Sequence, residues 1–199
     1  MYSKLPNLIL GFHGCNKKTY EKVIVNNKPL DPSLNTYDWL GNGIYFWEQN
    51  LERAKQWAKN KFGKEGAVIG AVIDLGYCLN LMDNNYVPLL KQGYELLKIK
   101  CESLGDELPT NRLGKDKLLR DLDCAVIEEI HDYKRILYDC NDSEGIPFDS
   151  VRGLFIEGNP IYEGSELYEK THIQICVRNP NCIKGYFNPL KHRDWYGYL

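Results

Sequence analysis

The segment GNGIYFWEQNLERAKQWAKNKF, residues 41–62, predicts a strand followed directly by a helix. Two glycines give the backbone conformational freedom just before Ile44 to Trp47. This run of β-branched and aromatic residues favours an extended chain. Asn50 is placed to cap the helix, whose apolar residues recur at helical spacing until Gly63 ends it. This segment therefore supplies one core strand and one amphipathic helix beside it.

Further strands are predicted on both sides of this unit, because short apolar runs of strand length recur there. They are Asn7 to His13 (NLILGFH), Ala67 to Leu75 (AVIGAVIDL), Val151 to Glu157 (VRGLFIE), Ile173 to Val177 (IQICV) and Ile183 to Phe187 (IKGYF). Asn16 is placed to cap a helix through Val25, and leucines at helical spacing predict helices near 85–104 and 115–134. Strands, then helices, then strands again favour the α+β class. We expect a single domain over 1–199, with a helical insertion at about 84–135.

Composition narrows the range of partners. The chain has 199 residues, 43% hydrophobic and 26% charged, which suits one well-buried core. A net charge of −2 gives no long-range attraction to nucleic acid or to an anionic membrane. No run approaches the roughly 20 apolar residues of a membrane span, and no cleavage region follows the N-terminal apolar run. We therefore expect no membrane partner. We expect any other partner to be recognised by local geometry rather than by net charge.

The seven cysteines are scattered, odd in number and without the close spacing of a zinc site. They are Cys15, Cys78, Cys101, Cys124, Cys140, Cys176 and Cys182. Free thiols in a reducing compartment are the simplest explanation, so the expected location is the cytoplasm and no metal is expected.

Three polar positions stand out against this framework. His13 and Gly14 end one strand, Tyr45 lies in GIYF, and Gln174 interrupts the apolar strand IQICV. Each also has a purely structural interpretation: a core histidine before a turn, an aromatic core strand, or an amide satisfied by neighbouring backbone. Their combination and order carry the functional hypothesis.

FHG, GIYF with the helix after it, and the late strand IQICV resemble, in this order, the diphtheria-toxin and poly(ADP-ribose) polymerase class of ADP-ribosyltransferases. The resemblance covers about residues 7–75 and 150–188. It implies an ADP-ribosyltransferase-like fold of two packed, mostly antiparallel sheets with flanking helices. It also implies that NAD⁺ is the co-substrate and that nicotinamide is released.

The resemblance assigns roles to individual residues of this sequence. Tyr45 would present its aromatic face to the flat, cationic nicotinamide ring, and the Gly14 backbone would bind the carboxamide. His13 would hydrogen-bond an adenosine ribose hydroxyl, and Gly43 belongs to the same cofactor-binding set. Trp57 would place a second aromatic ring at the nicotinamide, with plain core packing as the alternative.

Gln174 departs from the best-characterised members, which carry a glutamate at this position. A glutamine can still accept a hydrogen bond from the ribose 2′-hydroxyl, but it carries no charge and cannot act as a base. Losing one charged stabiliser costs on the order of 10²–10³ in rate, by analogy with oxyanion-hole deletions. Polymer elongation is therefore not expected, while transfer of a single ADP-ribose remains open.

An acidic segment, Gly158 to Thr171, comes just before the Gln174 strand, where relatives carry the loop that meets the acceptor. One of Glu163, Glu166 and Glu169 could replace the missing base, with Glu169 the first choice. The alternative is a solvated acidic turn.

The expected function is mono-ADP-ribosylation of a protein or nucleic-acid acceptor, as in bacterial toxin, defence or regulatory enzymes. Three alternatives stay open: NAD⁺ hydrolysis at the same site, a catalytically silent NAD⁺ or ADP-ribose binding module, and a structural domain. The toxin-like resemblance also leaves room for an inhibitor or antitoxin partner. The acceptor itself cannot be read from loops that have no transferable code.

Overall fold

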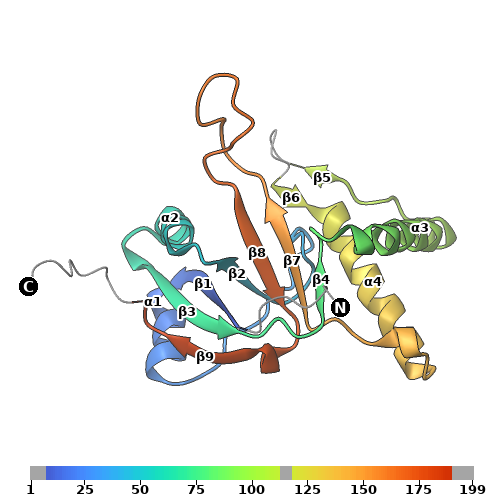
Figure 1. The fold of residues 1–199 in the computed structure, drawn as a ribbon, viewed down its shortest axis with the longest axis horizontal. Coiled ribbons are helices and arrows are strands. Elements are labelled where there is room, and N and C mark those ends of the chain that lie inside the picture. Colours follow the sequence, from blue (N-terminus) through green and yellow to red (C-terminus); the bar gives the residue numbers. More distant parts are fainter. Residues whose placement is uncertain (1–7, 113–117, 190–199) are drawn as a thin grey trace, which may run out of the picture.

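The computed structural model describes residues 8–112 and 118–189 (Figure 1). Its main sheet has seven strands in the order β4-β7-β8-β2-β1-β3-β9. Their bounds are β1 Ile9–Asn16, β2 Ile44–Glu48, β3 Gly66–Ile73, β4 Cys78–Asn80, β7 Ser150–Phe155, β8 His172–Val177 and β9 Ile183–Phe187. All neighbours pair antiparallel except β4 and β7, which are parallel. Six of these strands are those that the apolar runs predict, whereas β4 was not predicted; the α+β class is confirmed.

A short joint divides the sheet into two parts. β1 and β2 pair only at Gly11–Glu48 and Phe12–Trp47, whereas β1 and β3 pair along their whole length. Beyond the joint the two parts run at a steep angle to each other (Figure 1). Phe46 of β2 and Ile73 of β3, from opposite sides of the joint, belong to one buried cluster. The main core therefore lies between the two parts of one bent sheet.

The two packed sheets implied by the resemblance are thus replaced by one continuous sheet, because the β1–β2 joint hydrogen-bonds the two parts together. The second sheet is a two-stranded ribbon of β5, Asn111–Arg112, and β6, Leu119–Arg120.

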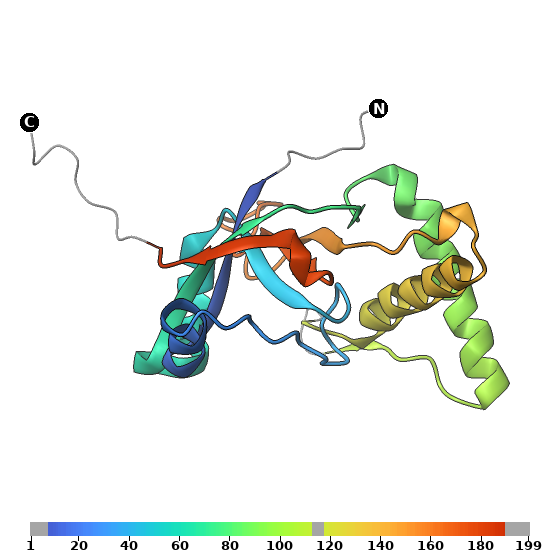
Figure 2. The same cartoon turned by 90° about the horizontal axis from the view of Figure 1, so that it is seen from below.

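The helices lie at two ends of the sheet (Figure 2). α1 and α2 lie at one end, and α3 and α4 at the other. Their bounds are α1 Lys17–Tyr20, α2 Leu51–Phe62, α3 Val87–Leu104 and α4 Asp121–Asp139. A π-helix, Glu21–Val25, extends α1, and single 3₁₀ turns occupy Gly63–Glu65, Asn84–Tyr86, Ser143–Gly145 and Pro180–Cys182.

The caps predicted from the sequence are present. Asn16 accepts from the Thr19 amide at 2.8 Å, and Asn50 accepts from the Arg53 amide at 3.0 Å. Gly63 ends α2 with φ +58°, a conformation that suits glycine. The helix expected over 115–134 begins only at Asp121, because residues 119–120 pair with β5; residues 115–117 lie outside the described part of the chain.

Candidate functional site

Four of the predicted site residues line one cleft of about 400 Å³: His13, Tyr45, Trp57 and Gln174. They come from β1, β2, α2 and β8, segments that are far apart in the sequence. Further walls come from the loop before β2, the end of β7, and Leu118 and Leu119 at the start of β6.

Strand register explains why the β2 and β8 side chains meet. Gln174 of β8 pairs with Trp47 of β2 on one side and with Gly153 of β7 on the other. Since side chains alternate along a strand, Tyr45, Trp47 and Gln174 point to the same face of the sheet. The opposite face carries Phe46, which lies in the main core. One face of these strands is thus core, and the other forms the cleft.

Tyr45 is held by its hydroxyl group. The hydroxyl donates to the Gly41 carbonyl at 2.8 Å and accepts from the Leu40 amide at 3.0 Å. Burial raises the pKa of Tyr45 far above its ordinary value, so the phenol stays protonated. The ring is thereby fixed at the cleft by its polar end, and its role is that of a neutral aromatic surface.

His13 has a defined tautomer. Its Nδ1 lies 2.8 Å from the Tyr45 carbonyl oxygen, and a carbonyl can only accept, so Nδ1 carries the proton. Burial lowers the pKa of His13, and the hydrogen bond to the carbonyl opposes that shift only in part. The imidazole is therefore neutral near pH 7, and Nε2 is left as an acceptor for a hydroxyl group.

Gln174 is oriented by a tryptophan that the sequence did not single out. The Trp39 indole Nε1 donates to Gln174 Oε1 at 2.6 Å. Because an indole nitrogen only donates, it fixes the amide oxygen on the Trp39 side and leaves the amide N–H groups to donate elsewhere. The hydrogen bond expected from a ribose hydroxyl would therefore go to an oxygen that already accepts one from Trp39.

Trp57 both lines the cleft and packs against its neighbours. Its ring centroid lies 5.6 Å from that of Trp47, and the Lys61 ammonium group lies 4.7 Å from the Trp57 ring. A Cβ on Gly14 would lie 2.9 Å from Trp57 Cε3 and 2.9 Å from the Ala54 carbonyl oxygen. Only glycine lets α2 come this close to β1.

Gly14 is not among the residues that line the cleft, but the direction of its backbone groups follows from the pairing of β1. The Gln49 amide donates to the Leu10 carbonyl at 2.8 Å, so Leu10, Phe12 and Gly14 direct their backbone groups toward β2. The β1–β2 register ends at Phe12 and does not extend to Gly14. The Gly14 amide is thus directed to the β2 side, away from the continuous β1–β3 ladder.

The structure does not bring the other predicted residues to the cleft. Gly43 has φ +156°, and a Cβ there would lie 2.6 Å from both Cys176 Sγ and the Val177 carbonyl, so it serves close strand approach. Glu163, Glu166 and Glu169 are exposed on the loop that projects between β7 and β8 (Figure 1). The backbone amide of Glu169 pairs with the Asn159 carbonyl at 3.0 Å, within that loop.

Several cleft residues escaped the sequence interpretation. Arg53 and Glu157 form an ion pair of 2.5 Å, with side chains only 8% and 14% exposed. Arg53, Trp57 and Lys61 follow at four-residue spacing on α2, a pattern that could have placed all three on one face. Asp38 and Trp39 lie in an irregular loop, where no such pattern exists.

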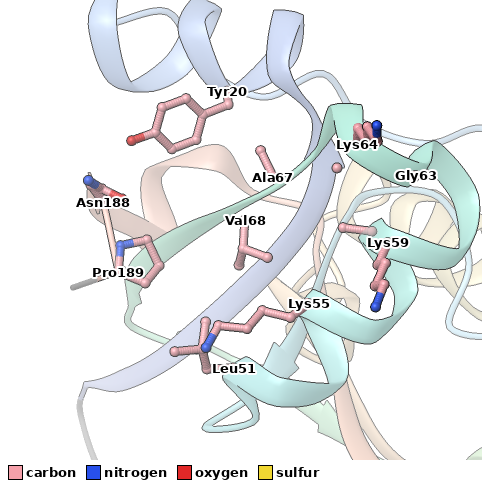
Figure 3. Close-up of a pocket in the computed structure, with 12 residues that line it drawn as sticks. Tyr20, Leu51, Lys55, Lys59, Gly63, Lys64, Ala67, Val68, Asn188 and Pro189 are labelled. Carbon is pink, nitrogen blue, oxygen red and sulfur yellow. The ribbon is translucent and has the colours of Figure 1, made fainter. Parts of the chain in front are cut away.

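A larger groove of about 740 Å³ lies on the other side of α2 (Figure 3). Leu51, Lys55 and Lys59 line it from α2, and Ala67 and Val68 line it from β3. None of the predicted site residues reaches this groove. We place the candidate site in the smaller cleft, where aromatic, imidazole, amide and carboxylate groups converge.

Within residues 8–112 and 118–189, no group of three or more histidine, cysteine or acidic side chains is arranged to hold a metal ion. In the same ranges, no helix has both the length and the apolar character needed to cross a membrane. All seven cysteines are free thiols.

Fold and cleft together define an α+β protein with one aromatic, polar cleft at the face of its central strands. The chain is 31% identical over 197 residues to the uncharacterized protein MJ0359 of Methanocaldococcus jannaschii, an alignment covering 87% of this chain and 83% of that protein. It belongs to the same family as that archaeal protein. No family model matches the chain, and no solved structure matches it.

Proposed function

We propose that this protein is an NAD⁺-dependent mono-ADP-ribosyltransferase with an ADP-ribosyltransferase-like fold. One observation carries the proposal: His13, Tyr45, Trp57 and Gln174, chosen from the sequence in separate segments, line the same cleft. The sheet is continuous rather than divided into two, but its two parts enclose a common core as two packed sheets would, and this supports the proposed fold.

Each side chain has a matching task toward NAD⁺. The fixed ring of Tyr45 offers an aromatic face to the cationic nicotinamide. The Nε2 of neutral His13 accepts a hydrogen bond from a ribose hydroxyl, and the Gly14 backbone faces the carboxamide. Gln174, oriented by Trp39, positions the nicotinamide ribose without moving a proton.

The reaction breaks the bond between ribose C1′ and the nicotinamide nitrogen, and its electron pair leaves with nicotinamide. The acceptor forms a new bond to C1′ and loses its proton. A protein or a nucleic acid is the proposed acceptor, and seven free thiols suit a reducing cytoplasm as the proposed location.

A second candidate is a catalytically silent NAD⁺ or ADP-ribose binding module. The engagement of the Gln174 oxygen by Trp39 favours it, because the residue at this position then offers neither charge nor a wholly free acceptor.

Labelled NAD⁺, added with and without cell lysate, distinguishes the candidates. Label on macromolecules supports transfer, free ADP-ribose supports hydrolysis, and binding without turnover supports the module. Absence of binding to both NAD⁺ and ADP-ribose would refute both candidates.

Tyr45→Ala provides the site-specific test. We expect it to remove roughly 1–3 kcal/mol of ring contact and so weaken NAD⁺ binding about 5- to 150-fold. Tyr45→Phe keeps the ring and should keep most of the affinity. Tyr162→Ala is the matched control, since Tyr162 is 62% exposed on the projecting loop. Equal NAD⁺ affinity in Tyr45→Ala and the control would remove the ring pocket from this cleft.

A further inference from the structure

Asp38 places a carboxylate in the cleft that neither the sequence pattern nor the resemblance assigns. It lies in the loop before β2, and its Oδ2 accepts from Ser33 Oγ at 2.5 Å and from Asn35 Nδ2 at 3.2 Å. Its backbone closes the same turn: the Asp38 amide donates to the Asn35 carbonyl at 3.2 Å, and its carbonyl accepts from the Gly41 amide at 2.7 Å. The carboxylate is therefore held in place by its own loop.

Asp38 differs from the other carboxylate that lines the cleft. Glu157 is compensated by Arg53 at 2.5 Å and by Lys170 at 3.8 Å. Among the ion pairs of residues 8–112 and 118–189, none involves Asp38. Both hydrogen bonds above go to one oxygen, Oδ2. Asp38 is thus a half-buried carboxyl group without a salt-bridge partner in the described structure.

The loop also connects this charge to Gln174. The next residue, Trp39, is the one whose indole fixes the Gln174 amide oxygen. Consecutive residues of one loop therefore bring a carboxylate and an oriented amide to the same cleft. A single glutamate would supply both a negative charge and a hydrogen-bonding group. Here the carboxylate belongs to Asp38 and the hydrogen-bonding amide to Gln174.

We propose that ionised Asp38 is the counter-charge for the cationic nicotinamide–ribose part of NAD⁺. This inference rests on the proposed function. As the bond from C1′ to the nicotinamide nitrogen breaks, its electron pair goes to the ring, and the positive charge passes to the ribose C1′. Asp38 stays unprotonated throughout and is not consumed; the proton of the acceptor goes to water.

The surroundings of Asp38 determine the expected pH dependence. Its electrostatic neighbours are Lys61 of α2, Tyr45 of β2, Cys176 of β8 and Cys124 of α4. Burial raises the pKa of Tyr45 and of both thiols, to about 11 for Cys124, so these three groups are neutral near pH 7. Burial also raises the pKa of Asp38, opposed by its hydrogen bonds and by Lys61. Activity that needs the ionised carboxylate should therefore fall as pH drops through this raised pKa.

The binding test compares NAD⁺, whose ring is cationic, with NADH, whose ring is neutral. The unmodified protein should prefer NAD⁺ by about tenfold or more, as expected for one charge pair within a partly buried cleft. Asp38→Asn keeps the shape and hydrogen-bond acceptor but removes the charge, and should abolish that preference. Asp38→Glu keeps the charge and should retain a preference for NAD⁺.

The turnover test uses the same variants. If the unmodified protein cleaves NAD⁺, Asp38→Asn should lower kcat by about 10²–10³ and remove the acidic limb of the pH profile. Asp31→Asn is the matched control, because Asp31 lies in the same connection between β1 and β2 and is 82% exposed. The control should leave binding, kcat and pH profile unchanged.

The two proposals fail differently. If the unmodified protein binds neither NAD⁺ nor NADH, the proposed function and the role of Asp38 both fail. If it binds NAD⁺ and Asp38→Asn retains the unmodified preference, the proposed function stands and the role of Asp38 is overturned. Thermal unfolding of each variant shows whether it is folded, and Asp38→Glu tests the charge should Asp38→Asn not fold.

Discussion

Gly153→Ala should disturb the cleft by displacing Trp39, whose indole packs against Gly153 of β7. A Cβ on Gly153 would lie 2.5 Å from Trp39 Cη2, 3.1 Å from Trp39 Cζ3 and 3.2 Å from Leu81 Cδ1. The indole cannot move freely, because it is 9% exposed and its ring centroid lies 5.4 Å from that of Phe155. The added methyl group must therefore shift either Trp39 or the backbone of β7.

The expected cost has two parts. Overpacking of a filled core costs about 1–3 kcal/mol. Displacing Trp39 also breaks its hydrogen bond to Gln174, which is worth about 0.5–1.5 kcal/mol. Together they predict a loss of about 1.5–4.5 kcal/mol in the free energy of unfolding, and a Tm lower by roughly 3–18 °C for a chain of this size.

Urea denaturation measures this loss as a shift in midpoint at unchanged slope. Gly185→Ala in β9 is the matched control, because a Cβ there meets nothing within 4 Å, and its stability should change by less than about 0.5 kcal/mol. Trp39→Phe estimates the contribution of this hydrogen bond separately, because it removes the indole N–H together with some ring volume. If Gly153→Ala is as stable as Gly185→Ala, the close packing of Trp39 on β7 is wrong.

Two further predictions concern buried ionisable groups. Burial lowers the pKa of His131 to about 3, so the stability it provides is complete above the unfolded pKa of about 6.5 and is lost as pH falls toward 3. The free energy of unfolding should decrease over this range by at most about 1.4 kcal/mol per pH unit from this group, and less in His131→Phe; an identical pH slope in that variant would contradict the assignment. Glu157→Gln leaves the buried Arg53 without its carboxylate and should destabilise the protein by up to about 3–5 kcal/mol, measured by urea denaturation. Glu65→Gln, at an exposed ion pair with Lys17, should cost less than about 1 kcal/mol, and an equal loss in both variants would refute the distinction.

Local signals in the sequence predicted the elements well. Ile183–Phe187 is the strand its apolar residues predict, and the Asn16 and Asn50 caps lie where the sequence places them. Such signals depend on neighbouring residues alone. The main local failure was the start of α4, where residues 119–120, expected in the helix, form β6 and pair with β5.

Four of the residues that line the cleft were chosen from the sequence, but its other members and its internal contacts were not. His13, Tyr45 and Gln174 were chosen because FHG, GIYF and IQICV occur in the order that resembles the ADP-ribosyltransferase class, whereas each residue alone also has a purely structural interpretation. The Trp39–Gln174 hydrogen bond joins residues 135 positions apart, and no periodicity reports such a pair. The acidic loop was expected near the cleft from its sequence position, yet its direction depends on the hairpin that carries it.

The strand order has a consequence for how this protein emerges from the ribosome. β1, β2 and β3 are made early and can pair at once, but the free edge of β2 has to wait for β8. Until residues 172–177 are available, β2 presents an open edge beside the aromatic side chains of the future cleft. Unpaired edges of this kind recruit other chains during synthesis. Fragments that stop before β8 should therefore aggregate, even though they contain His13, Tyr45 and Trp57.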